Sequence, residues 1–214
     1  MKNWRPISLL SVLYKLASAA IANRLKGVLD ILISKAQTGF LKGRFIGDST
    51  RLVYDIMHHL EFNNLPGQLM LVDFQKVFDS VSWTFIMTIL KHFNFGDSFQ
   101  KWVAVFNNNI KAYVLQSGFL SESFSIERGC RQGDPIASYL FLLCAQVLYY
   151  LFDQNSNIHG ISIEGTLFKL TQFADDTTIF LDGSRDSLIA ALNTLEIFGS
   201  ISGLKVNTEK TKIS

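Results

Sequence analysis

The pattern of apolar and polar positions along the chain predicts several amphipathic helices. From residue 7 to residue 32 apolar side chains recur at helical spacing, and Ser8 is available to cap the first turn. Further helices are predicted at residues 48–62, 82–93, 96–107, 134–152 and 186–198. The expected buried face of the first helix consists of Leu9, Leu13, Leu16, Ala20, Leu25 and Leu29.

Short apolar runs bounded by turn residues predict the strands. Residues 69–72 form a near-continuous apolar run after Pro66-Gly67, which is typical of a strand covered on both faces. Strands are also predicted at residues 158–163, 167–173 and 177–181, and a β-hairpin is predicted at residues 111–126. Helices and strands together indicate a mixed helix-and-sheet fold.

Three acidic residues stand at the predicted strand ends. Asp73 follows the first strand directly, and Asp175 and Asp176 occupy the tip of the hairpin formed by residues 167–181. Neighbouring carboxylates repel each other and raise each other's pKa unless a cation lies between them. If the two strands are adjacent, the three carboxylates form a site for two hard divalent cations. The alternative is a solvated turn, because Asp is common in turns.

Composition indicates a globular protein. The chain has 214 residues, of which 48% are hydrophobic and 18% charged, and its net charge is +2. Cys130 and Cys144 are too few for a zinc site, and the absence of an Asn-x-Ser/Thr sequence agrees with an intracellular protein, nuclear or cytoplasmic and not secreted. Lys15 interrupts the first apolar run, which excludes a signal peptide. Residues 136–152 are predicted to form a buried core helix rather than a membrane span.

Two polar loops carry further candidate chemistry. Residues 37–44 form a glycine-punctuated loop with two cations, Lys42 and Arg44. In the second loop, Asp134 is a good helix N-cap and Pro135 a good first helical residue, so the helix of residues 134–152 is expected to begin here.

Four sequence blocks occur in a characteristic order. They are VDFQKVFDSV, RGCRQGDPIASYLF, FADD and GLKVNTEKTKI, preceded by NWRPISLLSVLYKLASAAIANRL. Together they closely resemble the reverse transcriptases of non-LTR (LINE-type) retrotransposons. The resemblance implies an α+β fold, with a polymerase palm (βαββαβ, ferredoxin-like) at residues 67–214 and a partial helical fingers region at residues 1–66. The thumb that members of the family carry is expected to be absent from this chain. It also implies RNA-directed DNA polymerase activity.

The resemblance also implies roles for individual residues. Two Mg²⁺ ions would be held by Asp73, Asp175 and Asp176, and Lys210 could protonate the departing pyrophosphate, the alternative being a surface lysine. Contacts to the incoming nucleotide are expected from Arg5, Phe78, Gln132 and Gly133. Contacts to the nucleic-acid backbone are expected from Lys42, Arg44 and Arg131. The expected partners are an RNA template, a DNA primer and deoxynucleoside triphosphates, with no membrane.

The sequence also departs from the family pattern. Val77 stands where the family usually has alanine, and Ile136-Ala137-Ser138 replaces the usual Leu-Ser-Pro. The chain resembles the central block of a larger polyprotein, cut at both ends. A second hypothesis therefore stays open: a non-catalytic, truncated retroelement remnant that binds nucleic acid weakly at most, because duplex affinity depends on many phosphate contacts.

Overall fold

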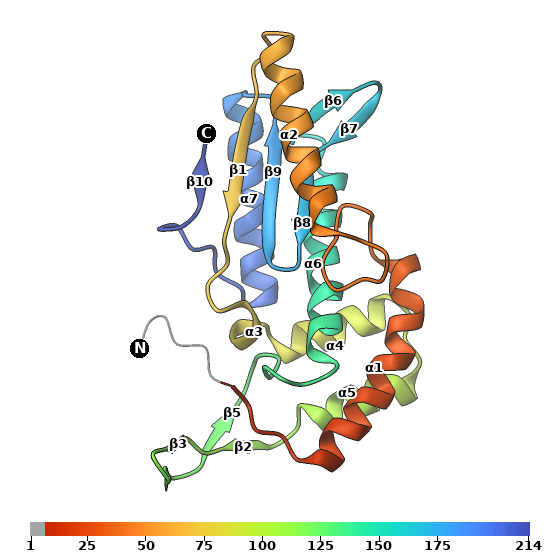
Figure 1. Ribbon diagram of the computed structural model, residues 1–214, viewed down its shortest axis with the longest axis vertical. Coiled ribbons are helices and arrows are strands. Elements are labelled where there is room, and N and C mark those ends of the chain that lie inside the picture. Colours follow the sequence, from red (N-terminus) through yellow and green to blue (C-terminus); the bar gives the residue numbers. More distant parts are fainter. Residues whose placement is uncertain (1–6) are drawn as a thin grey trace.

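A four-stranded antiparallel sheet lies at the centre of the computed structural model, which describes residues 7–214. The predicted nucleotide contact of Arg5 lies outside the described residues. The strand order is β10-β1-β9-β8 (Figure 1). The strands are β1 (Gln68–Val72), β8 (Leu170–Phe173), β9 (Asp176–Leu181) and β10 (Lys212–Ile213). The first strand lies between the third and the fourth, which is the order of a βαββαβ fold and confirms the predicted α+β class.

Helices cover both faces of this sheet. Helix α2 (Ile46–Phe62) lies on one face, and α6 (Ala137–Gln154) and α7 (Arg185–Ser202) lie on the other (Figure 1). Strand residues alternate accordingly: Met70 and Val72 enter the main core, whereas Phe180 packs with Ile56 of α2 in a smaller cluster. Both faces are therefore buried along most of β9. On β1 only the face of Met70 and Val72 is buried, because Leu71 on the other face is 47% exposed, so the predicted covering of this strand on both faces is wrong.

The remaining helices pack around the first half of α6. They are α1 (Val12–Leu32), α3 (Val77–Ser80), α4 (Trp83–His92) and α5 (Asp97–Phe106). The predicted hairpin at residues 111–126 is present but interrupted, because it consists of two short pairs of strands. The outer pair is β2 (Ile110–Ala112) with β5 (Phe124–Ile126), and the inner pair is β3 (Leu115–Gln116) with β4 (Phe119–Leu120). A further small hairpin, β6 (Ile161–Ile163) and β7 (Thr166–Phe168), follows α6.

The predicted buried face of the first helix is wrong. Helix α1 begins at Val12, capped by Ser11, and its buried stripe consists of Ser18, Ile21, Ala22, Leu25 and Leu29. Leu9, Leu13 and Leu16 are 84%, 81% and 64% exposed. The step of five residues from Ala20 to Leu25 turns about 140° around a helix. The two halves of the predicted face therefore point to opposite sides, and only the second half is buried.

The predicted start of the long apolar helix is also wrong. Helix α6 begins at Ala137, and its N-cap is Ile136 rather than Asp134. The Asp134 carboxylate does accept a hydrogen bond from the Ile136 amide (3.3 Å), but it is mainly bound to side chains of another helix. The helix itself is a core helix, as predicted. Within residues 7–214, no helix has the length and apolarity that crossing a membrane requires.

Candidate active site

The register of the sheet places the predicted acids at one end of it. Val72 of β1 pairs with Thr177 of β9, so the next residue, Asp73, lies across from Asp176. Asp175 belongs to the two-residue turn that connects β8 to β9, because Phe173 pairs with Asp176. The backbone therefore brings the three acids from two distant parts of the sequence to neighbouring positions.

The turn itself has an unusual backbone. Residues 173–176, here called the aspartate turn, contain Ala174 at φ 54°, in the left-handed region that residues other than glycine seldom adopt. Ala174 is buried, Asp175 is half-buried and Asp176 is exposed. The turn thus presents Asp175 and Asp176 toward solvent, while Ala174 is buried inside the protein.

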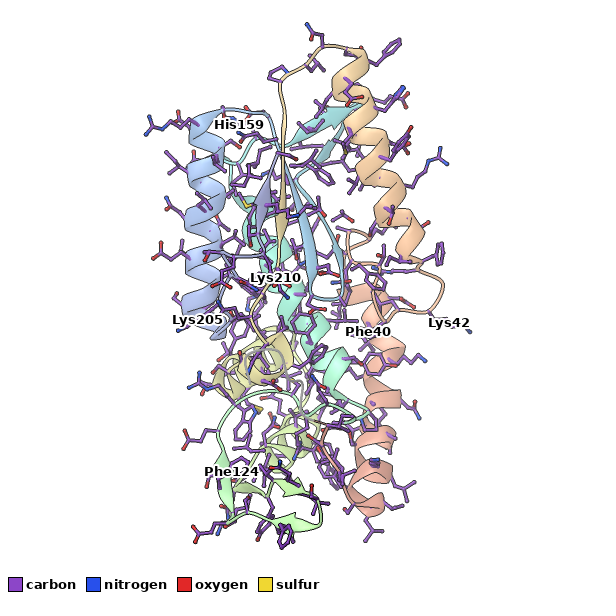
Figure 2. All side chains as sticks on the ribbon, turned by 60° about the vertical axis from the view of Figure 1, so that its left-hand side comes forward. Phe40, Lys42, Phe124, His159, Lys205 and Lys210 are labelled. Atoms are coloured by element: carbon purple, nitrogen blue, oxygen red, sulfur yellow. The ribbon has the colours of Figure 1, made fainter. Side chains whose placement is uncertain are left out.

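The Asp73 side chain makes contacts with the end of the chain. Its Oδ2 atom accepts a hydrogen bond from Asn207 Nδ2 (2.7 Å) and lies 3.8 Å from Lys210 Nζ. The backbones also join, because the Asn207 amide donates to the Asp73 carbonyl (2.7 Å). Lys210 is labelled at this end of the sheet in Figure 2. The predicted catalytic lysine and the first predicted metal ligand are therefore neighbours.

The predicted convergence of three carboxylates on one metal site is not seen. Among residues 7–214, no group of three or more acidic, histidine or cysteine side chains is arranged to hold a metal ion. A physical reason is that the Asp73 carboxylate is bound to Asn207 and to the Lys210 ammonium. The donor set nonetheless fits a hard divalent cation in kind, because carboxylate oxygens are the ligands that Mg²⁺ prefers.

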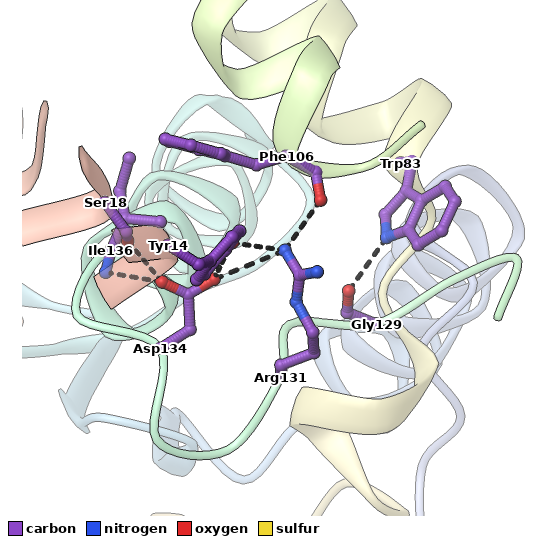
Figure 3. A network of polar contacts seen from close by, with 8 residues as sticks. All are labelled: Tyr14, Ser18, Trp83, Phe106, Gly129, Arg131, Asp134 and Ile136. Carbon is purple, nitrogen blue, oxygen red and sulfur yellow. Dashed lines mark hydrogen bonds and ion pairs between the residues drawn. The ribbon is translucent and has the colours of Figure 1, made fainter. Parts of the chain in front are cut away.

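A second loop is held in place by a buried polar network. Residues 129–136, here called the Gln132 loop, carry Arg131 and Asp134, whose side chains are 12% and 4% exposed (Figure 3). Asp134 accepts hydrogen bonds from the hydroxyls of Tyr14 (2.5 Å) and Ser18 in α1. The Arg131 guanidinium lies 3.4 Å from the Asp134 carboxylate, donates to the Phe106 carbonyl (2.6 Å) and lies over the Tyr14 ring. Helix α1 thereby fixes the loop.

Burial changes the acidity of two groups in this network. Burial, together with the hydrogen bond to Asp134, raises the pKa of Tyr14, although Arg131 opposes this shift. Burial also raises the pKa of the Cys130 thiol to about 12, with a smaller contribution from the charge of Asp134. Both groups are therefore neutral at physiological pH, and Arg131 offsets the buried Asp134 charge.

The structure separates the predicted nucleic-acid contacts into two kinds. Lys42 is exposed. Arg44 is 16% exposed, and its guanidinium donates to the carbonyls of Ile33 (3.0 Å), Ser34 and Gln37 (2.8 Å). Together with the buried Arg131, Arg44 therefore serves the fold in this structure, whereas Lys42 is available to a phosphate.

Three of the predicted nucleotide contacts, Phe78, Gln132 and Gly133, lie on two adjoining segments. Phe78 is half-buried against Phe141 of α6, and its carbonyl accepts a hydrogen bond from the Cys130 amide (2.5 Å). Gln132 is half-buried and Gly133 is exposed, and Gly133 has a φ of 94° that favours glycine. The Gln132 loop thus rests directly on the segment that follows Asp73.

Two residues that contact the site were not singled out from sequence. Asn207 binds Asp73, and Gln37, which is 1% exposed, binds Ala174 of the aspartate turn. Asn207 lies within the block GLKVNTEKTKI and Gln37 in the loop of residues 37–44, but a single polar residue in a loop carries no periodic signal. Only the three-dimensional pairing of distant segments reveals these contacts.

The sequence as a whole matches a known family. A family model described as "Reverse transcriptase (RNA-dependent DNA polymerase)" matches residues 1–214. The chain belongs to this family. The reverse transcriptase domain is also 28% identical, over 99% of the chain, to the transposon TX1 uncharacterized 149 kDa protein of Xenopus laevis, of which it covers 16%. It is 29% identical, over 98% of the chain, to the Pol polyprotein from the type-2 retrotransposable element R2DM of Drosophila melanogaster, of which it covers 19%.

These relatives confirm the predicted resemblance to LINE-type elements, and the chain spans less than a fifth of either one. Solved structures agree on the fold of the domain. Telomerase from Candida albicans, in complex with a TWJ fragment of telomeric RNA, superposes with a TM-score of 0.64 at 15% identity, covering 95% of this chain and 35% of that one. Apo telomerase from Candida tropicalis, truncated from its C-terminal domain, superposes with a TM-score of 0.61 at 15% identity, covering 94% of this chain and 40% of that one. The predicted polymerase-like α+β fold is confirmed.

Proposed function

We propose that this domain copies RNA into DNA by adding deoxynucleotides to the 3'-hydroxyl of a DNA primer. The observation that carries the proposal is the register of β1, β8 and β9, which brings Asp73, Asp175 and Asp176 to one end of the sheet. Membership of the reverse transcriptase family and the RNA bound in the Candida albicans structure support an RNA template. Residues 1–66 would serve as fingers and residues 67–214 as palm.

Family membership implies a divalent metal, typically Mg²⁺. We assign two ions to Asp73 and Asp175, with Asp176 as a third, less direct ligand. Bound Mg²⁺ would supply charge neutralisation for the triphosphate and a lower pKa for the primer hydroxyl. Lys210, which is exposed and lies 3.8 Å from Asp73, is assigned the role of giving a proton to the departing pyrophosphate.

The nucleotide would lie between the aspartate turn and the Gln132 loop. We assign to the half-buried Phe78 ring a contact with the sugar of the nucleotide, where the ring would obstruct a 2'-hydroxyl and so favour deoxyribose. We assign to Gln132 a hydrogen bond to the nascent base pair. At Gly133, the absence of a side chain would let the backbone approach that base pair closely. The contact between the Cys130 amide and the Phe78 carbonyl would keep these groups together.

The template would pass the loop of residues 37–44. Lys42 is assigned a phosphate contact, which positions the strand without reading its sequence. Arg44 and Arg131 are assigned phosphate contacts only where a strand can displace part of their present hydrogen bonds. Arg5, outside the described residues, is assigned the triphosphate, because a guanidinium binds phosphate oxygens in pairs.

Primer extension tests this function. The purified protein should extend a DNA primer on an RNA template with Mg²⁺ and deoxynucleotides, and the product should be complementary to the template. Asp73→Asn, which keeps the shape of the side chain but removes its charge, should abolish extension. Asp97→Asn, an exposed position at the start of α5, should not. A folded wild-type protein that extends no primer would contradict the proposal and favour the non-catalytic remnant.

A further inference from the structure

Ala174 in the aspartate turn needs outside support. Its left-handed backbone, at φ 54°, is unfavourable for a residue with a Cβ, because the Cβ lies too close to the following carbonyl oxygen. Such strain persists only where the surrounding structure imposes it. Since Ala174 directly precedes Asp175, whatever holds Ala174 also sets the direction of that carboxylate.

The side chain of Gln37 binds both peptide groups of Ala174. Its Oε1 atom accepts hydrogen bonds from the amides of Ala174 (2.8 Å) and Gly39 (2.8 Å), and its Nε2 atom donates to the Ala174 carbonyl (3.1 Å). Gln37 is 1% exposed and Ala174 5%. In such a buried place, hydrogen bonds have no competition from water, and loss of one partner leaves a costly unsatisfied group.

The backbone around Gln37 is also fixed to the strand that leads into the turn. The Gln172 amide of β8 donates to the Ala36 carbonyl (2.7 Å), and the Thr38 amide donates to the Gln172 carbonyl (2.8 Å). Residues 36–38 therefore extend the edge of the sheet. Gly39 completes the fit, because a Cβ there would collide with the backbone of Ala174.

We infer that Gln37 is a positioning residue for the reaction: it holds Ala174 in the left-handed conformation and thereby orients Asp175 toward the metal and the nucleotide. This inference rests on the proposed function. It connects the loop that would contact the template, residues 37–44, to the turn that carries the acids. Gln37 touches no reacting atom, so its effect passes entirely through the turn.

The test compares two buried glutamines. Gln37→Met keeps the length of the side chain but removes its three hydrogen bonds. Gln146→Met is the matched control, because Gln146 is 2% exposed and accepts a hydrogen bond from the Ser34 amide (2.8 Å), not from the turn. Hydrogen exchange at the Ala174 amide and single-nucleotide incorporation are measured for both variants, together with their thermal unfolding.

Gln37→Met should speed exchange at Ala174 at least about tenfold, because the hydrogen bond that protects this amide is lost. It should lower kcat by roughly 10- to 100-fold, as loss of an outer partner of a metal ligand does, with the KM for the nucleotide nearly unchanged. Gln146→Met should change neither. Adding Ala174→Gly should restore much of kcat in the Gln37→Met background, because glycine adopts the left-handed conformation without strain.

Unchanged hydrogen exchange at Ala174 and unchanged kcat in Gln37→Met would overturn the inference. A loss of kcat no greater than that in Gln146→Met, at equal thermal stability of the two variants, would also overturn it. If Gln37→Met does not fold, the double variant with Ala174→Gly decides: a folded, active double variant supports the inference, and an unfolded one contradicts it. If the wild-type protein incorporates no nucleotide, the proposed function fails, but exchange at Ala174 still tests whether Gln37 holds the turn.

Discussion

The aspartate turn and the Gln132 loop face the same proposed reaction but are held in different ways. The turn joins two paired strands, and its one strained residue is bound by the neutral side chain of Gln37. The Gln132 loop lies outside the sheet. Backbone hydrogen bonds join its start to Phe78 and Val81, and a buried ion pair together with Tyr14 and Ser18 of α1 holds its side chains. The turn takes its position mainly from backbone register, whereas the loop depends in addition on buried side-chain charges.

This difference predicts which region is the more sensitive to a single substitution. A sheet distributes its hydrogen bonds over many residues, so loss of one side chain leaves most of the register intact. A buried ion pair concentrates the cost, because removing one partner leaves an uncompensated charge inside the protein. The Gln132 loop should therefore lose more stability per substitution than the turn.

The largest stability effect is expected for Asp134→Ala. The change leaves the buried Arg131 guanidinium without its carboxylate, so the free energy of unfolding should fall by about 3–5 kcal/mol. Urea unfolding measures this, with Asp97→Asn as a control that should stay within about 0.5 kcal/mol of wild type. A fall below 1 kcal/mol for Asp134→Ala would mean that the network does not hold the loop.

Tyr14→Phe should have a smaller effect on the same network. It removes one hydroxyl that donates to Asp134 and contacts Arg131, so the free energy of unfolding should fall by about 1–3 kcal/mol. Tyr149→Phe is the control, because the Tyr149 hydroxyl contacts Asp153 only at 3.5 Å at the surface. Equal losses in both variants would contradict a special role for Tyr14.

Thiol labelling can show where Tyr14→Phe acts. Cys130 lies in the Gln132 loop and Cys144 in α6, and both are buried. Burial first, and the Asp134 charge second, raise the pKa of Cys130 to about 12, so its unreactive thiol form prevails in the folded protein at pH 8. Because the pKa of Cys130 is higher in the folded than in the unfolded protein, the free energy of unfolding should fall as the pH rises from the ordinary thiol pKa toward about 12. Tyr14→Phe should speed labelling of Cys130 more than that of Cys144.

The smallest effect is expected for Lys42→Ala. Lys42 is exposed and has no assigned structural role, so folding stability should stay within about 0.5 kcal/mol of wild type. If it contacts a template phosphate, binding to RNA should weaken for every sequence tested, and the slope of log affinity against log salt should fall by about 1. Lys91→Ala, at an exposed position in the last turn of α4, is the control. Identical binding in both variants would remove Lys42 from the proposed interface.

Much of the sheet could be predicted from sequence because its signals are local. The apolar run before Asp73 identifies β1, and the short apolar runs on either side of Asp175 and Asp176 identify β8 and β9, without knowledge of their partners. The resemblance of the ordered blocks then supplied the strand order, which no local pattern contains. The buried face of α1 was misassigned, because the exposed leucines at positions 9, 13 and 16 keep helical spacing with one another and differ from Leu25 and Leu29 only in phase.

The supports of the site could not be predicted. Gln37 contacts Ala174 from 137 residues away, and Tyr14 contacts Asp134 from 120 residues away, so neither pairing leaves a mark in any window of sequence. Asp134 shows how a local rule is overridden: its position favours a helix cap, but the hydroxyls of α1 and the Arg131 guanidinium bind its carboxylate more fully than the helix does. The acids were visible in the sequence, and the groups that orient them were not.

The central claim is that the acidic end of this sheet performs RNA-templated nucleotide addition, and single-nucleotide incorporation by Asp175→Asn tests it most directly. The assay supplies RNA template, DNA primer, the complementary deoxynucleotide and Mg²⁺, with circular dichroism to confirm that wild type and variant are equally folded. Incorporation should fall by more than the roughly 10- to 100-fold that loss of an outer partner costs, because Asp175 is assigned as a direct metal ligand. An Asp175→Asn protein that incorporates nucleotide as fast as wild type would contradict the account.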